Sequence, residues 1–257
     1  AEFVAKEKRE VAELLDYILH QGTSEKAYDN GIRDHGRPEG LRLEYFASHE
    51  KAKGAGLSEA EVVAMRLYTT KAYKFMNDPL RDDERASRSE ACPLSVSTYH
   101  AERGIKKLRA LNAPDLTRQL SDKTVDSVPG ASMARGGEGG TVSQEVTLWR
   151  GMRSVKVTDE FLEMGGTELA FMSTTTNLEV AVRYALSGQS LLFKIKARDF
   201  MVIGADIQWL SAFPAEREVL YPPLTYLRPT GKTEGITIER DGKKFKFVVV
   251  EVEPAIG

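Results

Sequence analysis

The chain has 257 residues, 41% hydrophobic and 29% charged, which is ordinary for a folded protein with one large domain or two small ones. Its formal net charge of −2 gives no argument for nucleic acid or an anionic membrane as a partner. No apolar run approaches the roughly 20 residues that cross a bilayer, so we expect no membrane insertion.

Cysteine and histidine are scarce in the sequence. The one cysteine, Cys92, excludes a disulfide within the chain, and four scattered histidines offer no zinc-binding spacing, so we expect no metal. The charged start, "AEFVAKEKREVAELL", is typical of a helix rather than of a signal peptide. These features favour an intracellular protein, with a secreted effector as the alternative.

Residues 1–120 predict a helical subdomain. Apolar residues recur at helical spacing over three stretches, 2–22, 57–78 and 97–114. Ser58 and Glu61 form a capping box at the start of the second helix, and Pro79 lies just past its end. We expect the third helix to stop near residues 112–114. Residues 121–145 are rich in Gly and Ser and predict a flexible loop, because "GGEGG" lacks the residues of a phosphate-binding loop.

After residue 145 the hydrophobic period changes to two, which predicts a β-rich core over residues 146–257. A helix at 177–188 interrupts the predicted strands, which are 145–152, 190–197, 200–205, 217–223, 224–231, 233–240 and 243–253. Asp241 and Gly242 predict a hairpin turn. Helices followed by strands predict an α+β fold, and we expect both parts to form one integrated domain.

Two glutamates, Glu216 and Glu218, stand one residue apart before an apolar run. On a strand they would share one face, where two carboxylates repel and raise each other's pKa. Either both are solvated at an exposed edge, or each has a partner or a task. If they act as acid and nucleophile, a retaining glycosidase is one interpretation.

Two further segments carry polar groups next to apolar strands. Arg150 ends the strand "TLWR" and is followed by Gly151; a buried arginine needs an anion, which could be a carboxylate or a diphosphate. "FMSTTTN" brings four hydroxyl groups, at residues 173–176, to the start of a helix. N-capping explains one of these hydroxyls but does not require four.

Together these motifs resemble the R-S-E class of ADP-ribosyltransferases, which includes arginine-specific bacterial toxins and vertebrate ecto-enzymes. The resemblance covers about residues 57–228 and rests on Arg150–Gly151, on "STT" from Ser173 and on "EREVLYPP" from Glu216. It implies a mixed or antiparallel β core of two packed sheets, which binds NAD. Departures from the pattern are S-T-T in place of S-T-S and the long loop before Arg150.

The resemblance also implies roles for the motif residues. Arg150 would bind a phosphate of NAD, and Gly151 would bond the nicotinamide amide through its backbone. Ser173 would support the catalytic glutamate, Glu218, which stabilises the oxocarbenium ion as nicotinamide departs. Glu216 would orient the acceptor guanidinium and remove its proton.

Four other residues complete the predicted site. Thr174, Thr175 and Tyr184 are expected among the NAD-binding residues, although Tyr184 could equally be a core residue of its helix. Phe213 is expected in the turn that recognises the target protein, either exposed or packed inward, with Trp209 as its competitor.

The sequence therefore predicts an enzyme that transfers ADP-ribose from NAD to arginine side chains of a target protein, without a metal. An NAD glycohydrolase, with water as the acceptor, is the alternative within enzymes. A glycosidase leaves Arg150 and the hydroxyl cluster unexplained, and a binding module with an inactive site leaves the intact motifs unexplained.

Overall fold

Helices fill the first half of the chain and strands most of the second, as the change of hydrophobic period predicts. The computed structural model describes residues 2–21, 27–28, 31–38, 41–85, 87–123, 145–187, 190–240 and 243–257. Its helical elements, with π and 3-10 turns written η, are α1 Glu2–Asp16, η1 Tyr17–Gln21, α2 Leu43–Ala47, α3 Glu50–Gly54, α4 Glu59–Leu67, η2 Tyr68–Ala72, α5 Tyr73–Arg81, α6 Ser95–Lys123, α7 Asp159–Met164, α8 Leu178–Ala185, η3 Phe200–Val202 and η4 Pro214–Glu216. Its strands are β1 Ala27–Tyr28, β2 Gly31–Ile32, β3 Val146–Arg153, β4 Gly166–Glu168, β5 Met172–Thr175, β6 Ser190–Ala197, β7 Ala205–Asp206, β8 Glu218–Tyr221, β9 Thr225–Arg240 and β10 Lys243–Ala255.

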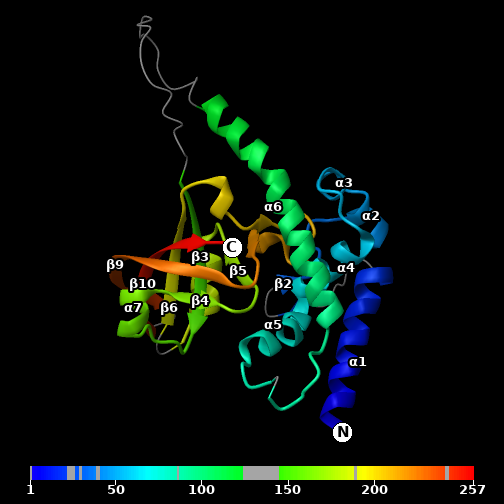
Figure 1. Cartoon of the computed structure of the whole chain (residues 1–257), viewed down its shortest axis with the longest axis horizontal. Helices are drawn as coiled ribbons and strands as arrows, with labels where there is room; N and C mark the ends of the chain where they lie inside the picture. Colours follow the sequence, from blue (N-terminus) through cyan, green and yellow to red (C-terminus); the bar gives the residue numbers. More distant parts are fainter. Residues whose placement is uncertain are drawn as a thin grey trace, which may run out of the picture.

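The α+β prediction is confirmed. Figure 1 shows helices α1 to α6 on one side of the molecule and the strands β3, β4, β6, β9 and β10 on the other. The capping box at Ser58 and Glu61 forms as the sequence predicts and starts α4.

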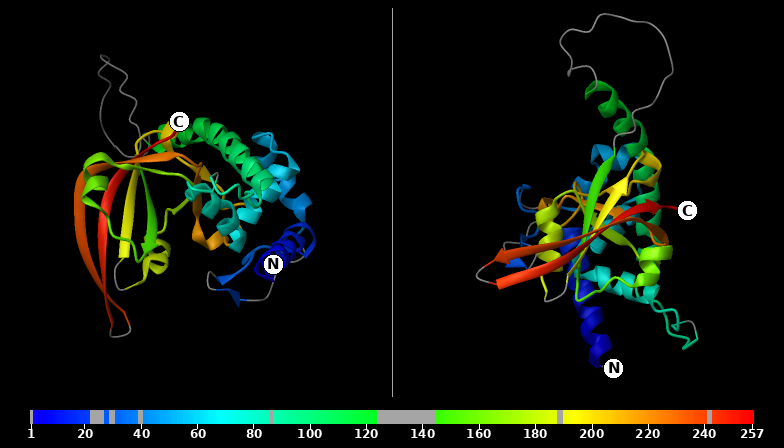
Figure 2. Two further views of the ribbon diagram at one scale, coloured as in Figure 1. Left: turned by 60° about the horizontal axis from the view of Figure 1, so that its bottom comes forward. Right: turned by 90° about the vertical axis from the view of Figure 1, so that its left-hand side faces the viewer.

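The main sheet is mixed and has eight strands in the order β4-β9-β10-β6-β3-β5-β8-β7. The expected division into two packed sheets is not confirmed, because hydrogen bonds connect all eight strands. The connection between its two parts is narrow: one register pair, Trp149 opposite Thr175, joins β3 to β5. The β9–β10 hairpin extends far from the rest of the sheet (Figure 2).

Several predicted boundaries are wrong. Residues 224–231 and 233–240 form one strand, β9, because β10 pairs with it over most of its length. Residues 57–78 form α4, η2 and α5 rather than one helix, because the backbone is not helical at Thr70. Residues 200–205 form the turn η3 and the start of β7 instead of one strand, because the Asp199 carboxylate accepts the Met201 N–H and stabilises a turn there. Pro79 lies inside α5 rather than past its end. Helix α6 does not stop at 112–114 but continues to Lys123, because a proline removes one helix hydrogen bond without ending every helix.

The predicted loop at 121–145 is only partly within the described chain. Residues 121–123 belong to α6, and residues 124–144 lie outside the described residues, as does the turn at 241–242.

One hydrophobic core joins the helical half to the strands. It combines side chains of α4, such as Val62 and Met65, with Phe171, Leu210 and Leu220 from the second half of the chain. The helical residues therefore bury their apolar face against the acid-bearing part of the sheet rather than against one another alone.

Helix α8 lies against β3 at Gly151. A Cβ atom at this position would lie 1.9 Å from the Ala181 carbonyl oxygen and 3.1 Å from the Ala185 side chain. Glycine is therefore required by the packing of α8, which is a different reason from the ligand contact that the sequence suggested.

We expect Gly151→Ala to lower the free energy of unfolding by about 2–3 kcal/mol, because the helix must move away from β3. Urea denaturation measures this change. The matched control is Gly235→Ala on β9, where no atom lies within 4 Å of the added Cβ and the change should stay within about 0.5 kcal/mol. Equal stability of the two variants would contradict the packing argument.

Candidate active site

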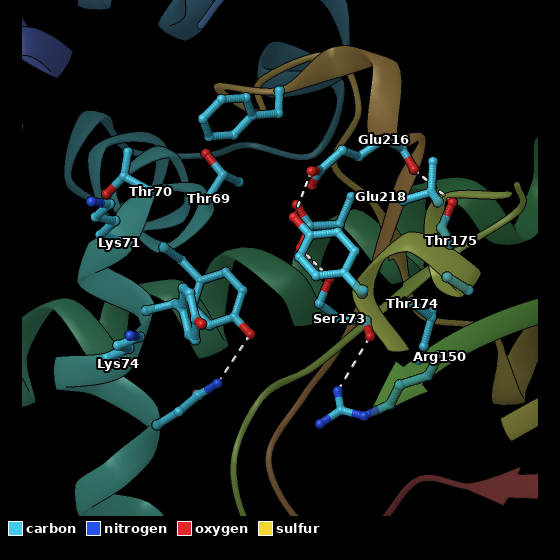
Figure 3. A pocket seen from close by; sticks show the side chains of 18 of the residues that line it. Thr69, Thr70, Lys71, Lys74, Arg150, Ser173, Thr174, Thr175, Glu216 and Glu218 are labelled. Carbon is cyan, nitrogen blue, oxygen red and sulfur yellow. Dashed lines mark hydrogen bonds between the residues drawn. The ribbon is translucent and has the colours of Figure 1, made fainter. Parts of the chain in front are cut away.

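The residues that the motifs single out converge on one cavity of about 560 Å³. Its lining includes every predicted site residue, namely Arg150, Gly151, Ser173, Thr174, Thr175, Tyr184, Phe213, Glu216 and Glu218 (Figure 3). Trp209, the competitor of Phe213, instead stacks on His49 with ring centroids 4.5 Å apart. A volume of this size is within the range of cofactor and substrate pockets.

Arg150 reaches the cavity from β3 and binds a carboxylate. Its Nη2 donates to Oε2 of Glu168 at 3.1 Å, and its Nη1 donates to the Ser173 carbonyl at 3.2 Å. The other Glu168 oxygen accepts from Nε of Arg81 at 2.9 Å. Burial lowers the pKa of Arg150, while Glu168 acts in the opposite direction. Glu168 thus takes one of the two guanidinium donors that would suit a phosphate, and the Ser173 carbonyl takes the other.

Sequence reasoning missed Glu168 and Arg81. Glu168 lies in β4, whose partner β9 begins more than fifty residues later, so no local pattern indicates its contact with Arg150.

The three hydroxyl groups of β5 hold the segment that carries the acids. Ser173 Oγ donates to Oε1 of Glu218 at 2.6 Å. Thr174 Oγ1 donates to the Val219 carbonyl, and Thr175 Oγ1 to the Glu216 carbonyl, both at 2.6 Å. The threonine hydroxyls therefore bind protein backbone, although both residues line the cavity.

Glu216 and Glu218 do not share a strand face, so that part of the sequence argument is wrong. Glu216 ends the 3-10 turn η4, and Arg217 adopts a left-handed conformation with φ +48° before β8 begins at Glu218. The two carboxylates reach the same cavity because this turn reverses the chain between them. A left-handed non-glycine residue is strained, and such strain persists where the surroundings determine the conformation.

Glu218 is a buried acid, with 5% of its surface exposed. Burial raises the pKa of its carboxyl to about 7; hydrogen bonds from Ser173 and Ser211 act against this rise, and the nearby Glu216 charge adds to it. Ser211 is fully buried and was not singled out in the sequence, since a serine seven residues before an acid carries no signal.

Glu216 has a different environment and is only half-buried. Tyr184 Oη donates to its Oε1 at 2.6 Å. Burial raises the pKa of Glu216, whereas the Tyr184 hydrogen bond and the Arg183 charge act to lower it. Burial also raises the pKa of the Tyr184 phenol, which stays protonated and remains a donor.

Phe213 is buried, with 6% of its surface exposed, and belongs to the core shared with the helices. Of the two sequence alternatives the structure supports inward packing, with the ring also bordering the cavity. An exposed aromatic contact with a target protein is therefore not supported at this residue.

The opposite wall of the cavity comes from η2 and α5. Asn77 donates through Nδ2 to Tyr68 Oη at 3.2 Å and to the Phe171 carbonyl at 3.3 Å. Its Oδ1 is buried and has no protein partner.

The sequence matches the family described as "ART: NAD:arginine ADP-ribosyltransferase" over residues 23–239. The match spans most of the chain, so the chain belongs to this family. It is an ADP-ribosyltransferase, a class that uses NAD as its substrate. Among curated proteins no sequence match is found.

Solved structures with a similar fold are bacterial ADP-ribosyltransferases. HopU1 of Pseudomonas syringae is 13% identical, with 95% of this chain and 97% of that chain covered and a TM-score of 0.50. Plx2a, a toxin from Paenibacillus larvae, is 16% identical over 82% of this chain and 94% of that chain, with a TM-score of 0.48. At these identities the likeness concerns the fold.

The described residues contain no group of three or more His, Cys, Asp or Glu side chains arranged to hold a metal ion. They also contain no helix whose length and hydropathy would let it cross a membrane.

The Glu218 carboxyl should titrate near pH 7, and Ser173→Ala should move its midpoint upward. The serine hydrogen bond favours the charged form, so its loss favours the proton. The measurement is ¹³C NMR of glutamate-labelled protein, with the signal assigned by its loss in Glu218→Gln. Thr174→Val is the control, because its hydroxyl binds backbone rather than the acid. An unchanged or lower midpoint in Ser173→Ala would refute the role of this hydrogen bond.

Proposed function

We propose that the enzyme transfers the ADP-ribose of NAD to the guanidinium group of an arginine on a target protein and releases nicotinamide. The observation that carries this proposal is the presence of two carboxylates at one cavity in different environments. Glu218 is buried and bound by hydroxyl groups, whereas the half-buried Glu216 is bound by the Tyr184 phenol. Two acids so arranged suit two different tasks.

Arg150 and the residues around it suit the binding of NAD. A phosphate would replace Glu168 as the partner of the Arg150 guanidinium. Gly151 borders the cavity and leaves its backbone uncovered on that side. Thr174 and Thr175 would contribute mainly by holding β8 and the turn before it.

Glu218 would stabilise the positive charge that develops on the nicotinamide-side ribose. In this step the bond between the ribose C1′ and the nicotinamide nitrogen breaks, and both electrons leave with neutral nicotinamide. An ionised carboxylate held by Ser173 is a fixed negative charge at a buried position, where such a charge is most effective.

Glu216 would receive the acceptor. Its carboxylate can pair with a guanidinium, orient one nitrogen toward C1′ and take up the proton that the nitrogen loses when the new bond forms. If water takes the place of the guanidinium, the same site hydrolyses NAD, so glycohydrolase activity is the competing function. The proposal that arginine is the acceptor rests on residue 216 being a glutamate, whose carboxylate can pair with a guanidinium.

Isosteric changes of the two acids test this assignment. We expect Glu218→Gln to lower both agmatine modification and NAD hydrolysis by about 100-fold or more, because charge stabilisation is lost. Glu216→Gln should abolish agmatine modification but leave hydrolysis within about threefold. Nicotinamide release and mass spectrometry of agmatine measure the two activities. Normal transfer by Glu216→Gln would refute its role, and hydrolysis without any transfer by the unmodified enzyme would favour the glycohydrolase.

Tyr184→Phe keeps the aromatic ring and removes the hydroxyl that binds Glu216. Loss of one such hydrogen bond should raise the KM for agmatine roughly three- to tenfold and leave NAD hydrolysis nearly unchanged. Tyr184→Ala, which also removes the ring, tests the predicted contact with nicotinamide, since it should additionally raise the KM for NAD. Equal loss of transfer and hydrolysis in Tyr184→Phe would contradict a role directed at Glu216.

A further inference from the structure

A cluster of charged side chains is buried beneath the segment that leads to the acids. Asp34 is 1% exposed and pairs with Arg66, also 1% exposed, through Nη2 and Oδ2 at 3.1 Å. Arg37 and the Tyr17 hydroxyl also donate to the Asp34 carboxylate. A cluster of this kind gives little net stability compared with apolar packing, because each charge loses its hydration.

The charged cluster forms hydrogen bonds to the backbone of residues 208–212. Arg37 donates to three carbonyls, those of Gln208 at 2.8 Å, Trp209 at 2.7 Å and Ser211 at 2.6 Å. Arg66 donates to the carbonyl between them, at Leu210, at 2.8 Å. The Asp34 N–H donates to the Ala212 carbonyl at 2.7 Å. The cluster therefore binds five consecutive carbonyls, those of residues 208–212.

The loop that contains residues 207–212 contacts Glu218, the proposed catalytic acid. The Ile207 N–H donates to the Glu218 carbonyl at 3.1 Å, and the Ser211 hydroxyl, which accepts the Phe213 N–H at 3.1 Å, also hydrogen-bonds to the Glu218 carboxylate. Arg37 therefore binds the backbone of the same residue whose hydroxyl supports Glu218. Arg217, at the end of this loop just before Glu218, has a left-handed backbone with φ +48°. A left-handed non-glycine residue indicates that the surroundings impose the loop conformation.

We propose that Arg37, held by Asp34, is a positioning residue for Glu218 that acts through the backbone and hydroxyl of Ser211. The inference rests on the proposed role of Glu218 in NAD cleavage, but not on arginine as the acceptor. Its consequence is that segment 31–38, far from the R-S-E motifs in sequence, sets the orientation and the proton affinity of the acid.

The test uses nicotinamide release from NAD without an acceptor, measured against pH. Groups that face Glu218 are Ser173, Ser211 and Glu216, and its charge also acts on Tyr68 and Tyr184. Arg37→Met removes the three carbonyl contacts and leaves the ion pair between Asp34 and Arg66 in place. We expect kcat to fall roughly tenfold and the apparent pKa of kcat/KM to rise by about one pH unit.

Ser211→Ala should produce the same upward shift of the apparent pKa. The double variant Arg37→Met/Ser211→Ala should show no larger shift, because both changes disrupt the same hydrogen bond to Glu218. The matched control is Arg109→Met. Arg109 also donates to two backbone carbonyls, of Ile203 at 3.0 Å and Met201 at 2.6 Å, but in a segment that does not contact the acids. Its pH profile should match that of the unmodified enzyme.

The outcomes separate this inference from the proposed function. If Glu218→Gln cleaves NAD normally, the proposed function fails. If Glu218→Gln is inactive but Arg37→Met keeps the unmodified pH profile, the positioning role is overturned. It is also overturned if Arg109→Met shifts the profile equally, since a general loss of stability would then explain both, or if the double variant shows the sum of two independent shifts.

Discussion

The arrangement of the site depends on one constraint. The Glu218 carboxylate is buried from water, and no Lys or Arg side chain of the described residues forms an ion pair with it. Burial of an ionisable acid opposes its charge, and the hydrogen bonds that offset this come from the hydroxyl groups of Ser173 and Ser211. These two serines belong to strand β5 and to the loop before η4. Strand β5 pairs with strand β8, and the loop contacts β8 through the Ile207 N–H, which donates to the Glu218 carbonyl, so both segments lie next to the acid.

The buried arginine of the site, Arg150, lies beside Glu218 without pairing with it. Its guanidinium donates to the Ser173 carbonyl and to Glu168, and Glu168 also accepts from Arg81. A direct pair between Arg150 and Glu218 would lower the pKa of the acid but would also cancel the charge that the reaction is proposed to need. Because Glu168 takes the Arg150 donor instead, the two groups remain available for the two separate roles that we propose for them.

The helical half contributes to the site in two ways. It supplies the wall that carries Tyr68 and Asn77, and it buries an apolar face together with Phe171, Leu210 and Leu220. The cluster at Asp34 is embedded in this shared core and binds the loop that leads to the acids. The helices and strands therefore share one hydrophobic core, and a residue before position 40, Asp34, binds the loop that leads to Glu218.

The sequence by itself determined the α+β class, the capping box at Ser58 and the positions of strands β3, β6, β8, β9 and β10, and it singled out residues that line the cavity. These features depend on local periodicity and on short motifs, which neighbouring residues specify. Only the tertiary structure decided that the sheet is continuous, that a turn rather than a strand separates Glu216 from Glu218, and that Phe213 faces inward. It also revealed Glu168, Asn77, Ser211 and the Asp34 cluster, because their roles depend on partners far away in the chain, and no local pattern encodes which distant groups folding will bring together.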